Sequence, residues 1–104
     1  MSWEKISVEA DIVLGEQIEK RRLAREVTRK QLGKVIKVTL QQIEKYEKGI
    51  DRVPMARLEI IGEFLDARVQ KRIVRRISNL RKLESETGEI KDELVEIYST
   101  IFDD

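Results

Sequence analysis

The stretch TLQQIEKYEKG, Thr39 to Gly49, combines hydrogen-bonding side chains with helical spacing. Thr39 suits the N-cap of a helix and Gly49 suits its C-terminal end, so the stretch predicts one short helix. Two adjacent amides, Gln41 and Gln42, stand in its first turn. An amide side chain both donates and accepts hydrogen bonds. The pair can therefore read the polar edge of a ligand, or the two residues can simply be exposed helix formers.

Composition excludes most catalytic chemistry. The 104 residues include no cysteine and no histidine, which removes disulfides, thiolate metal sites and imidazole bases. We predict no catalytic residue, no metal site, no cofactor and no small-molecule ligand. A nuclease that holds a metal through Asp and Glu is the remaining enzymatic alternative. Its acids would have to come from the tail, away from the basic segment.

The sequence also contains no apolar run near the roughly 20 residues that span a bilayer. Residues 1–10 lack the apolar middle of a signal peptide. We expect a cytoplasmic protein with no membrane partner and with room for one core.

Charge is distributed unevenly along the chain. Glu16 to Arg52 holds eleven Lys or Arg against six acids, whereas Glu84 to Asp104 holds eight acids against Lys91 alone. Arg68 to Lys82 contains seven bases and no acid. Such asymmetry favours a basic face that meets a polyanion. The basic run at 68–82 has two interpretations: it extends that face, or it pairs with the acidic tail, which we favour.

Apolar spacing predicts an all-α chain, because strand-like alternation is absent. The first helix is expected from an N-cap at Asp11 to about Arg25. Thr28 then caps a second helix, with Gln31 completing a capping box, and Pro54 suits the first turn of a fourth helix. The residues expected to face inward in these four helices are Leu14, Ile18 and Arg22; Leu32, Val35 and Ile36; Ile43, Tyr46 and Glu47; and Leu58, Ile61 and Leu65.

Two further apolar stripes predict a C-terminal helical hairpin, broken at Thr87 and Gly88. Its first arm is basic and its second arm is acidic, which favours antiparallel docking within one chain or between two. The two stripes consist of Ile73, Val74, Ile77, Leu80 and Leu83, and of Ile90, Leu94, Ile97, Tyr98 and Ile101.

Three stretches, LGEQIEKRR, TRKQLGKVIKVTLQQIEKYEKG and RVPMARLEIIGEFL, together resemble the lambda-repressor-like domain of bacterial regulators, also called Cro-type or XRE. The resemblance covers roughly residues 11–69. It implies a helix-turn-helix DNA-binding domain of four to five helices at residues 11–67, followed by the C-terminal extension at 68–104. It also implies that the third helix, about 39–48, lies in the major groove of DNA.

The resemblance assigns base reading to the start of the third helix: Thr39, Leu40, Gln41, Gln42 and Lys45. A glutamine amide can pair with adenine and a lysine can donate to guanine. Leu40 has two equal alternatives, contact with a thymine methyl group or packing inward.

Phosphate contacts are expected from Arg29, Lys37, Lys48 and Arg52. Lys37 stands where the family usually has glycine, so either the turn differs or Lys37 adopts a left-handed conformation that costs about 1 kcal/mol. Asp51 replaces a common asparagine, and its charge should weaken binding to phosphates. The resemblance also pairs Arg22 with Glu47, and both lie on inward faces of their predicted helices.

The function that we predict is a sequence-specific regulator that binds double-stranded DNA as a homodimer on a pseudo-palindromic operator. The alternative is an antitoxin-like or adaptor protein whose C-terminal helices bind a protein partner. The side chains that we expect to form the dimer contact are Ile73, Ile77, Leu80, Leu94, Ile97, Tyr98 and Ile101.

Overall fold

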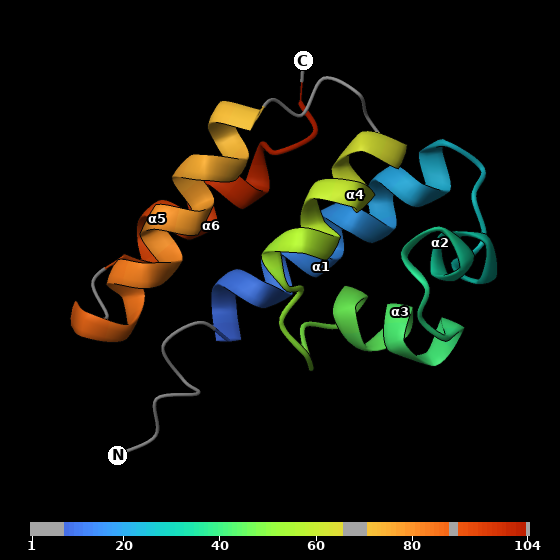
Figure 1. Cartoon of the computed structure of the whole chain (residues 1–104), viewed down its shortest axis with the longest axis horizontal. Helices are drawn as coiled ribbons and strands as arrows, with labels where there is room; N and C mark the ends of the chain where they lie inside the picture. The colour runs from blue at the N-terminus through green and yellow to red at the C-terminus, as the bar shows by residue number, and fades with distance from the viewer. Residues whose placement is uncertain (1–7, 66–70, 88–89, 104) are drawn as a thin grey trace.

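A computed structural model describes residues 8–65, 71–87 and 90–103. Within these ranges the chain is helical and contains no strand (Figure 1). The all-α prediction is confirmed. The helices are α1 Val8–Ala24, α2 Arg29–Ile36, α3 Leu40–Glu47, α4 Met55–Leu65, α5 Lys71–Thr87 and α6 Lys91–Ser99.

Local capping residues set the ends of α2 and α3 as the sequence predicts. The Thr28 hydroxyl accepts a hydrogen bond from the backbone of Gln31, whose own side chain accepts from the backbone of Thr28, a complete capping box. The Thr39 hydroxyl caps α3 by accepting a hydrogen bond from the backbone N–H of Gln42. Gly49 follows the end of α3 with a φ of 73°. Short-range chemistry therefore fixes this part of the fold.

The start of α1 differs from the prediction. The helix begins at Val8, and Asp11 lies within it instead of capping it. The Asp11 side chain is largely buried and accepts hydrogen bonds from Arg52, 41 residues away. A long-range ion pair has therefore taken the carboxylate that the local pattern assigned to a cap.

The first four helices enclose the inward residues that the sequence predicts, with one exception. Val35 is 37% exposed, whereas Leu32 and Ile36 of the same helix are buried. A helix of two turns buries only a narrow stripe, and Val35 lies at its edge. Gly15 lets α1 cross close to the end of α3, because a Cβ there would overlap the carbonyl oxygens of Tyr46 and Glu47.

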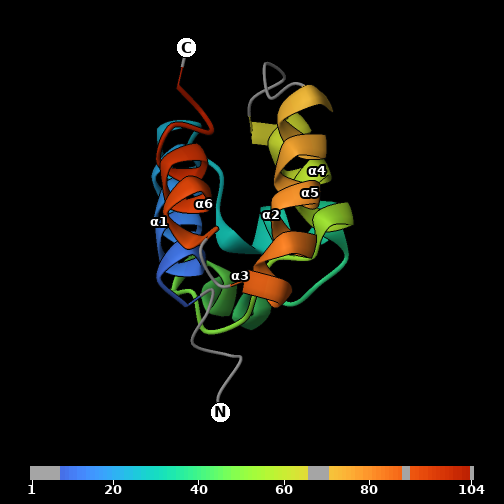
Figure 2. The same cartoon turned by 90° about the vertical axis from the view of Figure 1, so that its left-hand side faces the viewer.

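The last two helices run in opposite directions, as a hairpin should, but α6 packs mainly on α1 and less on α5 (Figure 2). Leu94 and Tyr98 of α6 are fully buried, and burial raises the pKa of the Tyr98 phenol. Residues of α5 and α6 belong to the same hydrophobic cluster as Leu14 and Ile18 of α1. The C-terminal extension is thus built onto the first four helices.

Within this hairpin, Leu83 departs from the predicted stripe and is 45% exposed. Most of the expected dimer-contact side chains are enclosed within the single chain: Ile77, Leu80, Leu94, Tyr98 and Ile101 are buried, and Ile73 and Ile97 are partly buried.

Candidate nucleic-acid interface

The turn between α2 and α3 brings the two helices together in a tight connection. Lys37 has φ 61° and ψ 46°, so it adopts the left-handed conformation expected if the turn keeps the family's geometry. Its backbone N–H, like that of Val38, donates to the carbonyl of Gly33. A Cβ on Gly33 would lie 2.6 Å from the Val38 carbonyl oxygen. The turn therefore needs Gly33, a requirement that spacing alone did not show.

The start of α3 presents a row of exposed side chains. Leu40 is 43% exposed, which excludes the alternative that it packs inward. Gln41 and Lys45 are also exposed. The Thr39 hydroxyl oxygen accepts the hydrogen bond that caps α3. This surface offers an amide, an ammonium group and an aliphatic group side by side, which is chemistry that can distinguish base edges.

The two glutamines of α3 are not equivalent. Gln42 is partly buried, and its amide nitrogen donates to the Asp51 carboxylate over 3.0 Å. This bond restricts the orientation of the Gln42 side chain, whereas the Gln41 side chain is exposed to solvent and forms no hydrogen bond with the described residues. Gln41 is the better placed of the two to reach an external ligand.

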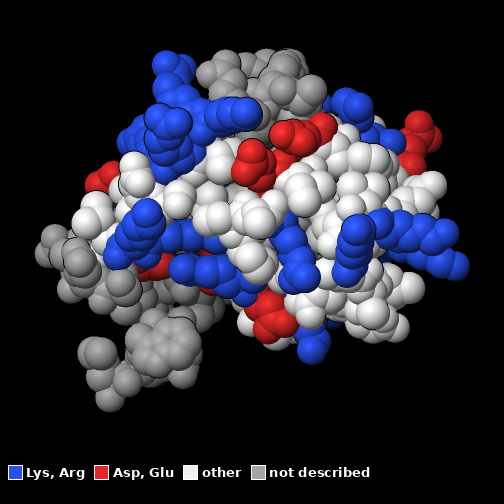
Figure 3. All heavy atoms as spheres, in the orientation of Figure 1, with Lys and Arg blue, Asp and Glu red and all other residues white. Residues whose placement is uncertain are grey.

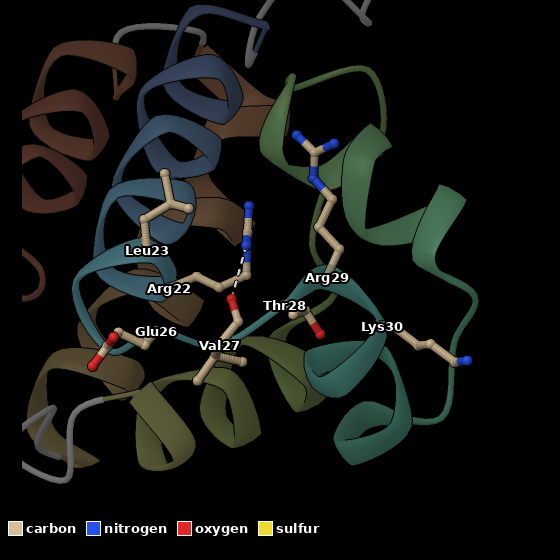
Figure 4. A pocket seen from close by; sticks show the side chains of 7 residues that line it. All are labelled: Arg22, Leu23, Glu26, Val27, Thr28, Arg29 and Lys30. Carbon is tan, nitrogen blue, oxygen red and sulfur yellow. Dashed lines mark hydrogen bonds between the residues drawn. The ribbon is translucent and has the colours of Figure 1, made fainter.

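A buried ion pair supports α3 from behind. Arg22 Nε donates to Glu47 Oε2 over 2.6 Å, and Arg22 Nη2 donates to Glu47 Oε1 over 3.2 Å. The third nitrogen of Arg22 donates to the Val27 carbonyl at an open hollow where α1 turns into α2 (Figure 4). The fold thus brings together both partners of the predicted pair, and all three guanidinium nitrogens of Arg22 donate hydrogen bonds.

Residues 18–71 match the model of the helix-turn-helix family. The chain belongs to the helix-turn-helix family. It is 46% identical over 59 residues to an uncharacterized HTH-type transcriptional regulator of Rickettsia prowazekii (strain Madrid E), across 57% of this chain and 45% of that protein. It is 43% identical over 56 residues to another uncharacterized HTH-type transcriptional regulator, from Sinorhizobium fredii (strain NBRC 101917 / NGR234).

The second match covers 54% of this chain and 39% of the relative, so the chain spans less than half the length of either protein. No solved structure matches this chain.

Arg29 opens α2 of the helix-turn-helix unit and lies among carboxylates. Its Nε donates to Glu47 over 2.9 Å and its Nη2 donates to Glu19 over 3.0 Å. The hydrogen bond to Glu47 is the main reason why the pKa of Arg29 is raised. These bonds join α1, α2 and α3, so Arg29 positions helices whether or not it also contacts a phosphate.

Arg52, in the loop after α3, is engaged in a similar way. Its guanidinium lies 3.2 Å from Asp11 and 2.7 Å from Glu84 of α5. Burial opposes the charged form of Arg52, but the hydrogen bond that Arg52 donates to Glu84 and the charge of Asp11 outweigh this effect, and the pKa of Arg52 is raised. The predicted phosphate contact of Arg52 would have to form alongside these two ion pairs.

The two lysines predicted to bind phosphate are both exposed. Lys37 projects from the turn before α3, and Lys48 follows the helix. Lys48 Nζ lies 3.1 Å from Glu44, and this hydrogen bond lowers the pKa of the Glu44 carboxyl. An exposed pair of this kind is weak and exchanges readily, so Lys48 is accessible to an anion.

Several positioning contacts had no signal in the sequence. Arg57 of α4 donates to the Tyr46 hydroxyl, and Arg81 of α5 donates to the Val53 carbonyl and the Tyr98 hydroxyl. Each joins residues between 11 and 28 positions apart, and only the inward spacing of Tyr46 and Tyr98 pointed to their burial.

Among the described residues no acidic cluster could hold a metal ion, and no helix could cross a membrane.

Proposed function

We propose that this chain is a sequence-specific transcriptional regulator that binds double-stranded DNA. Its third helix enters the major groove, where Leu40, Gln41 and Lys45 reach base edges, Gln42 is oriented by Asp51, and Thr39 caps the helix beside the DNA. Lys37 and Lys48 contact phosphates, with Arg29 and Arg52 beside them. The observation that carries the proposal is the exposed row at the start of α3, held from behind by a buried ion pair in a helix-turn-helix fold.

We further propose that the protein acts as a homodimer on a pseudo-palindromic operator, because one small domain makes too few base contacts for useful specificity. Two copies of α3 would then lie about 34 Å apart in successive major grooves. The predicted dimer residues are mostly buried within one chain. Their participation therefore requires that the hairpin, or α6 alone, be exchanged between copies.

Selection of bound fragments from a random pool of DNA duplexes tests both parts of this proposal. Enrichment of a palindrome is the expected result, with its half-sites one helical turn apart. Enrichment of a single unrepeated site would contradict the dimer, and no enrichment at all would contradict sequence-specific reading.

Substitution of Gln41 tests which residue reads the bases. Gln41→Ala should lose about 1 to 3 kcal/mol at the selected site and little on random duplex DNA. Gln17→Ala, an amide on α1 away from this surface, is the matched control and should change neither. Equal losses on both kinds of DNA would exclude Gln41 as a reader.

A further inference from the structure

The first half of α5 carries a cluster of exposed cations that the proposed interface does not use. We name Lys71, Arg72, Arg75 and Arg76 the α5 cation stripe; all four are exposed. Across the part of the chain that the structure describes, none of them forms an ion pair. The predicted pairing of the basic run with the acidic tail is therefore not found for these four residues.

Among the described side chains these four cations do not pair with the tail because α5 turns its apolar side, not this basic side, toward the rest of the chain. The side chains of Glu86 and Glu89, which the predicted pairing also includes, lie outside the described residues. Ile77 and Leu80 are buried, and so is Glu84. The cations occupy the opposite side, where Lys71 lies one turn from Arg75, and Arg72 lies one turn from Arg76. A helical turn of four residues separates such pairs by about 6 Å along the axis. No acid interrupts the sequence from Lys71 to Leu83.

These cations contrast with the arginines elsewhere in the molecule. Arg22, Arg29 and Arg52 each bind at least one carboxylate, and Arg81 binds a carbonyl and a phenol. None of the acids that the structure describes pairs with these four neighbouring cations, so within the described residues they form a site of uncompensated positive charge. Such a surface concentrates a polyanion near it.

The α5 cation stripe lies away from the reading helix. In both views α3 lies at the lower edge of the molecule, whereas the first turns of α5 lie at its upper edge (Figures 1 and 2). The space-filling view shows a basic cluster at the upper left, over the start of α5 (Figure 3). The cluster therefore lies at the opposite edge of the molecule from α3.

We propose that the α5 cation stripe is a second, sequence-independent site for the phosphate backbone of double-stranded DNA, so that the protein can hold two DNA segments together. The chemistry of the stripe supports a phosphate ligand over a protein. Protein interfaces have apolar cores depleted of charge, whereas the centre of this stripe is entirely cationic. Surfaces that bind DNA backbones are polar and strongly positive.

A second copy of the chain is the competing occupant, because Asp92, Glu93 and Glu96 on α6 are exposed acids. An interface built from these charges alone would bury little apolar area. Exposed ion pairs of this kind contribute between zero and about 1 kcal/mol each. The second copy is therefore an outcome that the test must be able to detect.

The test is a bridging assay with the full chain. One random-sequence duplex is fixed to beads, and capture of a second, fluorescent random-sequence duplex is measured with and without protein. The variant reverses three charges, Arg72→Glu, Arg75→Glu and Arg76→Glu. The matched control is Arg72→Lys, Arg75→Lys and Arg76→Lys, which keeps the charge but loses the arginine fork.

Wild-type protein and the lysine control should both capture the second duplex. The charge-reversed variant should capture about tenfold less, and the salt dependence of its duplex binding should fall by about 0.9 per lost phosphate contact. Unchanged capture by the charge-reversed variant would overturn the proposal. Loss of capture in the lysine control would also overturn it, because a phosphate site needs charge and not a planar fork.

Sedimentation of the charge-reversed variant separates DNA from a second copy. An unchanged sedimentation coefficient is expected, and a shift to a smaller species would assign the stripe to contact between copies and overturn the proposal. The proposal rests on the proposed binding of DNA at α3, but the capture of random duplexes does not depend on base reading by α3. A Gln41→Ala variant should keep bridging random duplexes whether or not Gln41 reads bases. Failure of the proposed reading role would therefore be seen only in binding to the selected site, and not in the bridging assay.

Discussion

Glu47 is the carboxylate on which three helices converge. It belongs to α3 and accepts hydrogen bonds from Arg22 of α1 and from Arg29 of α2. Only 4% of its surface is exposed. Burial of a charge is costly unless partners replace the lost water, and here two guanidinium groups do so. The arrangement fixes the position of α3 against α1 and α2.

This arrangement predicts strong coupling between Arg22 and Glu47. Glu47→Gln and Arg22→Met should each lower the free energy of unfolding by about 3 to 5 kcal/mol, because Glu47→Gln leaves the buried Arg22 without its carboxylate and Arg22→Met leaves the buried Glu47 with Arg29 alone. The double variant should cost less than the sum of the two. Chemical denaturation of all four proteins measures the coupling. Additive losses below about 0.5 kcal/mol each would show that the ion pair does not stabilise the fold.

Asp51 gives a second prediction at the level of single residues. Its carboxylate holds Gln42, but its negative charge lies in the loop beside the proposed DNA surface. Asp51→Asn keeps an oxygen that can accept from Gln42 and removes the charge. Removal of one repulsion of about 1 kcal/mol should strengthen binding to any duplex by about fivefold.

Asp51→Ala is the control, because it also removes the acceptor for Gln42. It should strengthen binding to random DNA as Asp51→Asn does, but relax base preference at the selected site. Fluorescence anisotropy on the two kinds of DNA distinguishes the variants. Identical base preference in both would mean that the Gln42 to Asp51 bond does not orient the glutamine.

The turn between α2 and α3 depends on a residue type that is poorly suited to it. Lys37 is left-handed at φ 61°, a conformation that glycine adopts without steric penalty. Lys37→Gly should therefore raise the free energy of unfolding by about 1 kcal/mol, while weakening duplex binding through loss of the ammonium group. Thermal unfolding and a salt titration of DNA binding measure the two effects.

Lys34→Gly provides the matched control within α2. It removes an exposed lysine of the same surface but places glycine in a right-handed helix, where it should lower stability by about 1 kcal/mol. Opposite signs for the two stability changes are the expected outcome. A destabilising Lys37→Gly would mean that the lysine side chain is needed for packing in the turn.

The elements that were predictable from the sequence are those fixed by near neighbours. Thr28 with Gln31, Thr39 with Gln42, and Gly49 act across three or fewer residues, so their local spacing is informative. Asp11 shows the limit of such reasoning, since it looks like a cap but binds Arg52. Spacing cannot reveal a partner that only the tertiary fold brings near.

The candidate site was predictable to a similar extent. The family resemblance predicted the left-handed turn at Lys37 and the Arg22 to Glu47 pair, which the structure contains, and the base-reading role of α3, which stays a prediction. It did not show that Arg29 and Arg52 donate to carboxylates, because these bonds depend on how helices pack. Val35 and Leu83 were misassigned for a related reason: periodicity marks an apolar stripe, and only the neighbouring helices decide how much of its edge is covered.

The C-terminal extension and the helix-turn-helix unit share polar as well as apolar contacts. Glu84 of α5 binds Arg52, and Arg81 donates to the Val53 carbonyl over 2.6 Å, so α5 holds the loop that follows α3. Leu94 and Tyr98 of α6 enter the cluster that contains Leu14 of α1. A substitution in the core of α6 should therefore also lower the stability of α3, even though α3 and α6 do not share a surface.

This continuity predicts that a core substitution in α6 lowers the stability of the whole molecule. Leu94→Ala removes a fully buried side chain and should lower the free energy of unfolding by about 2 to 5 kcal/mol. Leu83→Ala makes the same chemical change at a side chain that is 45% exposed, and should cost less than about 1 kcal/mol.

Hydrogen exchange of the backbone amides shows whether that loss spreads. If the chain unfolds as one cooperative unit, the amides of Ile43 and Tyr46 in α3 should lose as much protection under Leu94→Ala as those of Ile77 in α5. Preserved protection in α3 would mean that the extension unfolds alone. In that case the loop contacts of Glu84 and Arg81 would hold α5 to the helix-turn-helix unit too weakly to couple the two parts.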